Sequence, residues 1–236
     1  MTKISLSAAV VDTFPEVRIG LLYIEGMRNE GRNVVIEQLL RAEELRQREI
    51  LASVELPSLP EIKVWREAFK KFGSDPRDFR SSVEALLRRA RAGNKPLPQI
   101  NNLVDLYNYI SIKYHVPVGA EDLAKIEGDV ELAFASGSES GRALGADADE
   151  SCYPGEVIYR DAKSFLCRRW NWREADRTKI DEQSTRAILV IDTVGGLGQE
   201  TLAQALNETQ ALVERELSAT VKSYILDSQN RSAALS

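Results

Sequence analysis

Residues 97–114 read LPQINNLVDLYNYISIKY and carry the clearest structural signal in this chain of 236 residues. Two prolines precede a pair of asparagines, either of which can cap a helix. Apolar residues then recur at helical spacing as far as about Tyr114. A second stripe of the same helix is polar and includes Asp105 and Asn108. The stretch therefore predicts a helix with a large apolar face and one polar stripe.

Asp105 and Asn108 lie three residues apart, so they project to the same side of the predicted helix. Large apolar residues flank them, which favours a partly buried polar site. The alternative is that they satisfy backbone groups of a nearby loop, as buried polar residues usually do. The sequence leaves both interpretations open.

Two further helices are predicted just before this stretch. Residues 61–72 place apolar side chains on one helical face. Ser81, followed by Glu84 three residues later, is a capping-box pattern for a helix that ends near Gly93. Glu84 and Arg88 form an i, i+4 pair, which is expected to support the same helix.

The other elements are predicted from short apolar or alternating runs. Strands are expected at residues 18–25, 130–134, 156–161, 165–168 and 186–193. Helices are expected at residues 33–53 and 200–224, with a short helical turn at 122–126. The Gly- and Ser-rich residues 136–149 are expected to form an exposed loop.

These elements predict the α/β (α+β) class. The proline-rich residues 56–60 are interpreted as a join. They would separate an N-terminal strand–helix lobe, residues 1–60, from the main body, residues 61–226, on which it packs. Residues 227–236 are interpreted as a polar tail.

Composition excludes several classes of protein. Apolar residues make up 43% and charged residues 28%, as in ordinary globular proteins, and the chain has neither a membrane-length apolar run nor a secretory leader pattern. A cytoplasmic location is therefore expected. Two cysteines and one histidine form no zinc pattern, and no cofactor motif is present, so neither a metal nor a cofactor is expected. The net charge of −5 argues against charge-driven binding to DNA, although a local basic patch is compatible with it.

The most unusual stretch is CRRWNWR, residues 167–173. Tryptophans interleaved with arginines can stack on bases and pair with phosphates. The alternative is that the tryptophans lie in the core and the arginines pair with Glu156, Asp161 or Glu174, and composition alone favours this. His115 follows a predicted helix, where a capping or surface role is favoured over catalysis.

Five segments carry a family resemblance. They are RSSVEALLRR (80–89), LPQINNLVDLYNY (97–109), PVGAEDLAKI (117–126), PGEV (154–157) and CRRWNWR (167–173). Together they resemble the tRNA-editing domain of the phenylalanyl-tRNA synthetase β subunit, here as a free-standing relative, over about residues 65–193. The resemblance implies a three-layer fold with a sandwich-like β core. It also implies a pocket for an amino acid esterified to the 3′ end of tRNA.

The resemblance also implies roles for individual residues. Asn108 matches the family's pocket asparagine and Asp192 falls near its pocket glutamate, so both are catalytic candidates. Gly119 stands where the family has a pocket histidine. The candidates for substrate binding are Glu84, Asp105, Gly119, Arg168, Arg169, Trp170, Trp172 and Arg173. Three of these, the arginines, would hold the tRNA end, and a tryptophan would stack on the terminal adenine.

Two functions follow from these observations. The first is a trans-acting deacylase that hydrolyses mischarged aminoacyl-tRNA, with tRNA as its partner. The second is a non-catalytic module that binds RNA or an amino acid and keeps only the fold. No segment resembles a synthetase catalytic core, so aminoacylation is not expected. No motif supports a third function, chemistry on a small metabolite, and the sequence does not indicate an oligomeric state.

Overall fold

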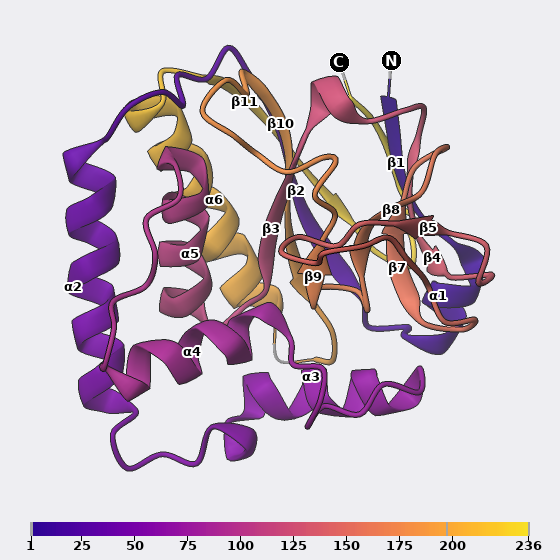
Figure 1. The fold of residues 1–236 in the computed structure, drawn as a ribbon, viewed down its shortest axis with the longest axis horizontal. Coiled ribbons are helices and arrows are strands. Elements are labelled where there is room, and N and C mark those ends of the chain that lie inside the picture. The colour runs from indigo at the N-terminus through magenta and orange to yellow at the C-terminus, as the bar shows by residue number, and fades with distance from the viewer. Residues whose placement is uncertain (1, 197, 236) are drawn as a thin grey trace.

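The computed structural model describes residues 2–196 and 198–235 and shows a mixed α/β protein (Figure 1). The helices are α1 (Ala8–Thr13), α2 (Val34–Ile50), α3 (Pro60–Lys71), α4 (Ser82–Ala92), α5 (Asn102–Tyr114) and α6 (Gln199–Glu216), with 3₁₀ turns η1 (Leu56–Ser58) and η2 (Leu123–Lys125). The strands are β1 (Thr2–Leu6), β2 (Arg18–Glu25), β3 (Val118–Asp122), β4 (Val130–Phe134), β5 (Ser140–Gly141), β6 (Glu150–Ser151), β7 (Val157–Arg160), β8 (Phe165–Arg168), β9 (Arg173–Glu174), β10 (Arg186–Thr193), β11 (Thr220–Leu226) and β12 (Ser232–Leu235).

A four-stranded antiparallel sheet lies at the centre of the molecule, in the order β11-β2-β10-β3. Its two inner strands are the apolar runs expected at residues 18–25 and 186–193, and both predictions are confirmed. They pair along their full length, from Arg186 opposite Glu25 to Thr193 opposite Arg18. Both strands are buried through most of their length, as continuous apolar runs of this kind usually are.

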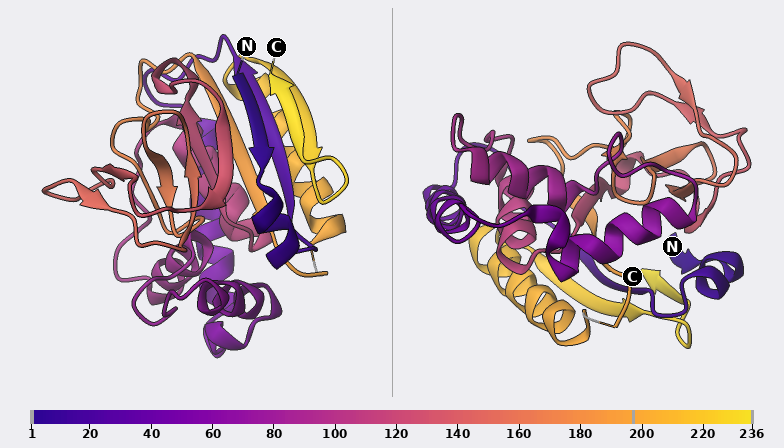
Figure 2. Two further views of the ribbon diagram at one scale, coloured as in Figure 1. Left: turned by 90° about the vertical axis from the view of Figure 1, so that its right-hand side faces the viewer. Right: turned by 90° about the horizontal axis from the view of Figure 1, so that it is seen from below.

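A six-stranded sheet, in the order β12-β1-β4-β7-β8-β9, packs beside the central sheet. Helices α2, α5 and α6 lie on the opposite side, so helices, central sheet and second sheet form three layers (Figure 1). Helices α3 and α4 lie at one end of the layers, and the loop around β5 and β6 projects from the body (Figure 2). The mixed α/β class expected from the sequence is confirmed.

The two ends of the chain meet in the six-stranded sheet. β1 pairs in parallel with β4 and antiparallel with β12, so the termini lie side by side (Figure 1). Residues 1–60, expected as a lobe on the main body, thus contribute β1 to one sheet and β2 to the other. Residues 227–236, expected as a polar tail, contain β12, whose Leu235 is buried.

The expected final helix, residues 200–224, is wrong in its last third. Helix α6 ends at Glu216, and residues 220–226 form β11 along β2. Ser218 adopts a left-handed conformation, with φ of 54°, and turns the chain back towards the sheet. β3 was also missed, because only a helical turn was expected after residue 117.

The expected capping box of α4 is also corrected. The helix begins and ends close to the prediction, with Gly93 left-handed at its C-cap. Within the described chain, however, the Ser81 side chain makes no capping hydrogen bond, and Glu84 instead pairs with Arg66 and Arg88.

No helix in the described residues is both long and apolar enough to span a bilayer.

Candidate functional site

A cavity of about 440 Å³ lies between the central sheet and the six-stranded sheet. Its wall is formed by parts of α4, α5, β3, β7, β8, β9 and β10, together with residues 170–172. Apart from Ile4, the lining residues fall between residues 82 and 192. A cavity of this size suits a small organic group, and pockets of this kind place a few polar groups in a largely apolar wall.

Helix α5 brings Asn108 to the cavity. Asn101 caps this helix by accepting a hydrogen bond from the Val104 amide at 3.1 Å, as its sequence predicts. Asn108 is largely buried and lines the cavity, but Asp105 does not belong to the lining. Asp105 instead accepts a hydrogen bond from the Ile100 amide at 2.9 Å, which is the backbone role that the sequence left open.

Asp192, near the end of β10, contributes a buried carboxylate to the cavity wall. It is 2% exposed, and the Tyr159 hydroxyl donates to its Oδ1 at 2.6 Å. Burial raises the pKa of Asp192 to about 7, although the nearby donors on Tyr159, Trp170 and Asn171 partly oppose this shift. The carboxyl therefore changes its charge near neutral pH.

Glu121 on β3 and Glu174 on β9 also line the cavity, and the sequence nominated neither for the site. The Ala120 amide donates to Glu174 Oε1 at 3.3 Å. Burial raises the pKa of Glu174, and burial followed by the charge of Glu174 raises the pKa of Glu121. Both side chains lie deep among protein atoms but stay partly accessible, because the cavity opens onto them.

Gly119 determines where the Glu174 carboxylate can lie. A Cβ atom at residue 119 would stand 2.8 Å from Glu174 Oε1, so the carboxylate uses the space that the glycine leaves free. The sequence resemblance placed a histidine of the family at this position. Here the Glu174 carboxylate, from another strand, lies against Gly119 and gives this wall of the cavity an acidic character.

A strained turn at residues 169–171 presents polar groups to the cavity. Arg169 and Trp170 have φ of 45° and 65°, a region that side chains other than glycine rarely adopt. In the described chain, the Asn171 amide oxygen is buried without a hydrogen-bond partner, whereas the Trp170 Nε1 and the Asn171 amide nitrogen face the Asp192 carboxylate without close hydrogen-bond geometry. A buried polar atom without a partner costs about 1–3 kcal/mol. Trp170 is also a core residue, edge-on to Phe14 and Trp65.

Trp172 and Arg173 mark the solvent side of the cavity. Both belong to the lining, and Arg173 is exposed. The Arg173 guanidinium lies 4.6 Å from the Trp172 ring, which in turn packs edge-on against Phe79 at 5.0 Å. The pair therefore combines a flat ring and a positive charge where a ligand would enter.

The remaining candidates lie outside the cavity lining. Arg168 is buried, and its Nε donates to Glu156 at 2.9 Å, while Arg169 stacks over Phe79 at 3.6 Å. Glu84 is fully buried between Arg66 and Arg88. For Arg168, the structure shows the pairing with Glu156 that the sequence gave as the alternative to RNA binding. The substrate-binding roles of Arg168, Arg169 and Glu84 therefore remain predictions.

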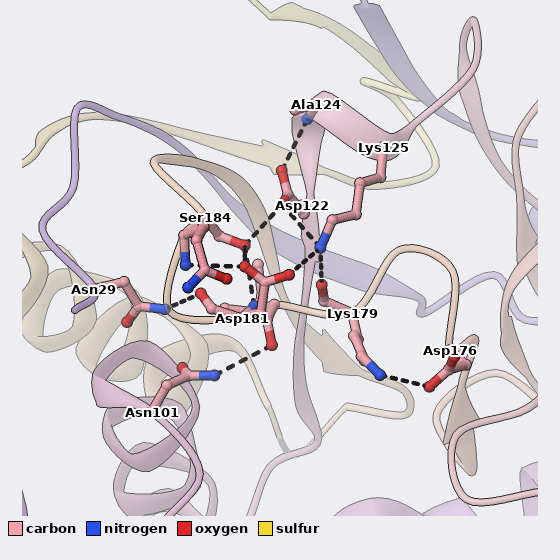
Figure 3. Close-up of polar contacts among 11 residues, drawn as sticks. Asn29, Asn101, Asp122, Ala124, Lys125, Asp176, Lys179, Asp181 and Ser184 are labelled. Atoms are coloured by element: carbon pink, nitrogen blue, oxygen red, sulfur yellow. Dashed lines mark hydrogen bonds and ion pairs between the residues drawn. The ribbon is translucent and has the colours of Figure 1, made fainter. Parts of the chain in front are cut away.

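A polar cluster fixes the strand that carries Gly119 and Glu121 (Figure 3). Ser184 Oγ donates to Asp122 Oδ2 at 2.7 Å, and Lys125 Nζ reaches Asp181 at 2.6 Å. Asn29 and Asn101 donate to the backbone of the same loop, at the carbonyl oxygens of Asp181 and Ile180. Because Asn101 also caps α5, one cluster positions both β3 and the helix that carries Asn108.

A catalytic histidine, a cysteine nucleophile and a metal site each find no support at the cavity within the described residues. His115 caps α5 in a left-handed conformation and lies 2.9 Å from Gln47 Oε1, which confirms the expected capping role. Burial raises the pKa of Cys167 well above its usual range and keeps the thiol protonated, so it is a poor nucleophile. Across residues 2–196 and 198–235, no group of three or more His, Cys, Asp or Glu side chains is arranged to hold a metal ion.

Comparisons with known proteins extend this description. The model of the B3/4 domain family matches residues 64–223. An N-terminal fragment of the phenylalanyl-tRNA synthetase β subunit from Pyrococcus horikoshii is similar at 12% identity, with a TM-score of 0.49. That alignment covers 95% of this chain and 53% of the fragment, so the chain spans about half of the fragment's length. No curated protein matches the chain. The family match confirms the resemblance that the sequence segments carry.

Proposed function

The chain belongs to the B3/4 domain family, and we propose that it is a trans-acting deacylase that hydrolyses mischarged aminoacyl-tRNA. The observation that supports this most strongly is the cavity. It is built almost entirely from residues inside the family match, and Asn108, Asn171 and Asp192 all belong to its lining. Polar groups that lack partners within the described chain are typical of a site that is completed by a ligand.

In this proposal the aminoacyl group enters the cavity and the tRNA stays outside. Asp192 binds the amino group of the ester, and Asn108 orients a water molecule beside the ester carbonyl. The water oxygen forms a bond to the carbonyl carbon, the bond to the ribose 3′ oxygen breaks, and the water proton reaches that oxygen. Correct placement of water and substrate can supply much of the rate enhancement without a covalent nucleophile.

Trp172 and Arg173 are the proposed contacts for the end of the tRNA. The exposed Arg173 offers a positive charge to a phosphate, and the Trp172 ring offers a stacking surface to the terminal adenine. With a net charge of −5, the protein would rely on this local contact and not on a broad basic face.

The test is deacylation of a panel of mischarged tRNAs by the purified protein. We expect hydrolysis of at least one aminoacyl-tRNA, and a loss of roughly a hundredfold in Asn108→Ala, as for removal of one oriented polar group at a reacting carbonyl. Asn207→Ala is the matched control, because Asn207 is exposed on α6, away from the cavity. Loss in both variants, or in neither, would contradict the role given to Asn108.

A non-catalytic module that binds RNA or an amino acid is the second candidate. The observation that favours it is Gly119: the resemblance implies a pocket histidine at this position, whereas here Glu174 takes the space that a side chain would need. The chain's single histidine, His115, contacts Gln47 and does not line the cavity. Binding of an aminoacylated RNA end without hydrolysis across the panel would select this function.

A further inference from the structure

One wall of the cavity carries two carboxylates, Glu121 and Glu174. They approach from different elements, β3 and β9. Glu174 Oε1 accepts from the Ala120 amide at 3.3 Å, whereas Glu121 Oε2 has the Thr178 hydroxyl nearby but makes no close hydrogen bond in the described structure. Neither carboxylate forms an ion pair with any of the described residues. The pair therefore has hydrogen-bonding capacity that the folded chain leaves unused.

The nearby arginines are already engaged. Arg177 donates to both carboxylate oxygens of Asp161 at 2.9 Å, and Arg173 stacks on Trp172 at the solvent side. The charge of Glu174 adds to burial in disfavouring the ionised form of Glu121. A cation between them would remove this repulsion and let both carboxylates carry their charge.

A second, independent observation that points to a bound ligand is the unpaired amide oxygen of Asn171. This residue is 8% exposed and lines the cavity. Its amide nitrogen faces the Asp192 carboxylate, and its amide oxygen has no hydrogen-bond partner among the described residues. A buried amide oxygen in this state is costly unless a ligand supplies the missing hydrogen bond. The two carboxylates thus belong to a built site with unmet polar groups.

We propose that the aminoacyl group bound in this cavity is that of a basic amino acid, whose side-chain cation lies between Glu121 and Glu174. The inference rests on the proposed function, in which Asp192 binds the α-amino group, and it adds a second anionic position. The cavity then has one acid for the α-amino group and two for the side chain. A neutral side chain of equal length would leave the carboxylates facing apolar atoms, and its ligand would therefore bind more weakly.

Two non-hydrolysable ligands test this specificity. Both are 3′-amides of adenosine: one carries lysine, and the other carries 2-aminoheptanoic acid, in which a methyl group replaces the side-chain ammonium. Isothermal titration calorimetry measures their affinities. We expect the lysyl ligand to bind roughly tenfold or more tightly, as for a charge-assisted hydrogen bond in a buried site. The double variant Glu121→Gln/Glu174→Gln should lose this preference.

Glu127→Gln is the matched control and should keep the preference, because Glu127 is an exposed partner of Lys163. Thermal unfolding checks that each variant is folded. Equal or tighter binding of the 2-aminoheptanoyl ligand, a preference that survives in the double variant, or no binding of either ligand would each overturn the inference.

The corresponding aminoacyl-tRNA esters separate this inference from the proposed function. A lysyl preference in binding without hydrolysis of either ester would support the basic ligand and contradict the deacylase. Hydrolysis of both esters at similar rates, without a preference in binding, would do the reverse.

Discussion

At the scale of single residues, the cavity combines side chains that the sequence identified with others that it could not. Asn108, Asp192, Gly119, Trp172 and Arg173 were all candidates, and all line the cavity. Their catalytic and binding roles remain proposals.

Glu121 and Glu174 were missed as site residues: Glu121 lies in the segment 117–126 but matched no pocket residue of the family, and Glu174 was considered only as a partner for the arginines. The pairing of β3 with β10, and of Glu121 with Lys179, brings these segments to the cavity. A single sequence does not specify such long-range pairing. The alternation of Gly119 and Glu121 along residues 118–122 was the only local signal.

Asp192 should give the stability of the protein a recognisable dependence on pH. Its pKa is raised, so its contribution to stability is fully present below the unfolded pKa and is lost as pH rises through about 7. Asp192→Asn keeps an acceptor for Tyr159 but cannot ionise. We therefore expect the free energy of unfolding of the variant, relative to wild type, to be higher at about pH 8 than at about pH 5, by up to about 2.5 kcal/mol.

Urea unfolding at the two pH values measures this difference. An offset between variant and wild type that is the same at both values would show that Asp192 is already ionised throughout, contrary to its burial.

At the scale of elements, helices with strong caps and periodicity were predicted well, and short strands were not. Residues 97–114 specified α5 because cap, apolar stripe and length all agreed. Residues 220–224, the first part of β11, were predicted as helix because their short run of mixed residues follows a true helix without a proline or glycine. Their strand form depends on the free edge of β2, which is a tertiary feature.

The N-cap residues Asn101 of α5 and Ser81 of α4 should contribute differently to the free energy of unfolding. Asn101 donates to Ile180 and accepts from Val104, so Asn101→Ala should lower the free energy of unfolding by about 1–2 kcal/mol. Ser81 makes no capping bond within the described residues, so Ser81→Ala should change it by less than about 0.5 kcal/mol. Urea unfolding of both variants measures the contrast, and equal losses would contradict it.

Two arginines of residues 167–173 should have different roles: Arg168 in stability and Arg173 in binding aminoacyl-tRNA. Arg168→Met leaves Glu156 buried without this partner and should lower the free energy of unfolding by about 3 kcal/mol. Arg173→Met should leave stability nearly unchanged, because Arg173 is exposed, but should raise the KM for aminoacyl-tRNA. Unfolding and deacylation measured on both variants test this division. A raised KM with Arg168→Met at full stability would place that arginine at the RNA.

At the scale of the whole molecule, an acidic protein is proposed to act on a polyanion. Repulsion between the two stays small because only the aminoacyl group and the terminal nucleotide of the tRNA contact the site. With one or two phosphate contacts, the slope of log affinity against log salt should be only about −0.7 to −1.4 for a single-stranded RNA end. Binding titrations over a range of salt concentrations measure it, and a much steeper slope would reveal a larger basic surface.

The three layers explain why one cavity can serve this purpose. The central sheet supplies β3 and β10, the second sheet supplies β7, β8 and β9, and α5 closes the wall with Asn108. Composition and patterning predicted the mixed α/β class, because strong helices alternate with buried strands. The place where the two sheets meet, and therefore the site itself, depends on long-range pairing that the sequence does not display.

The most direct test of the account is a crystal structure of the protein with a 3′-aminoacylamide of adenosine. The account predicts that the aminoacyl group lies in the cavity, with its amino nitrogen at hydrogen-bond distance from Asp192 and its carbonyl beside Asn108. An analogue bound outside the cavity, while the cavity stays empty at saturating concentration, would contradict it.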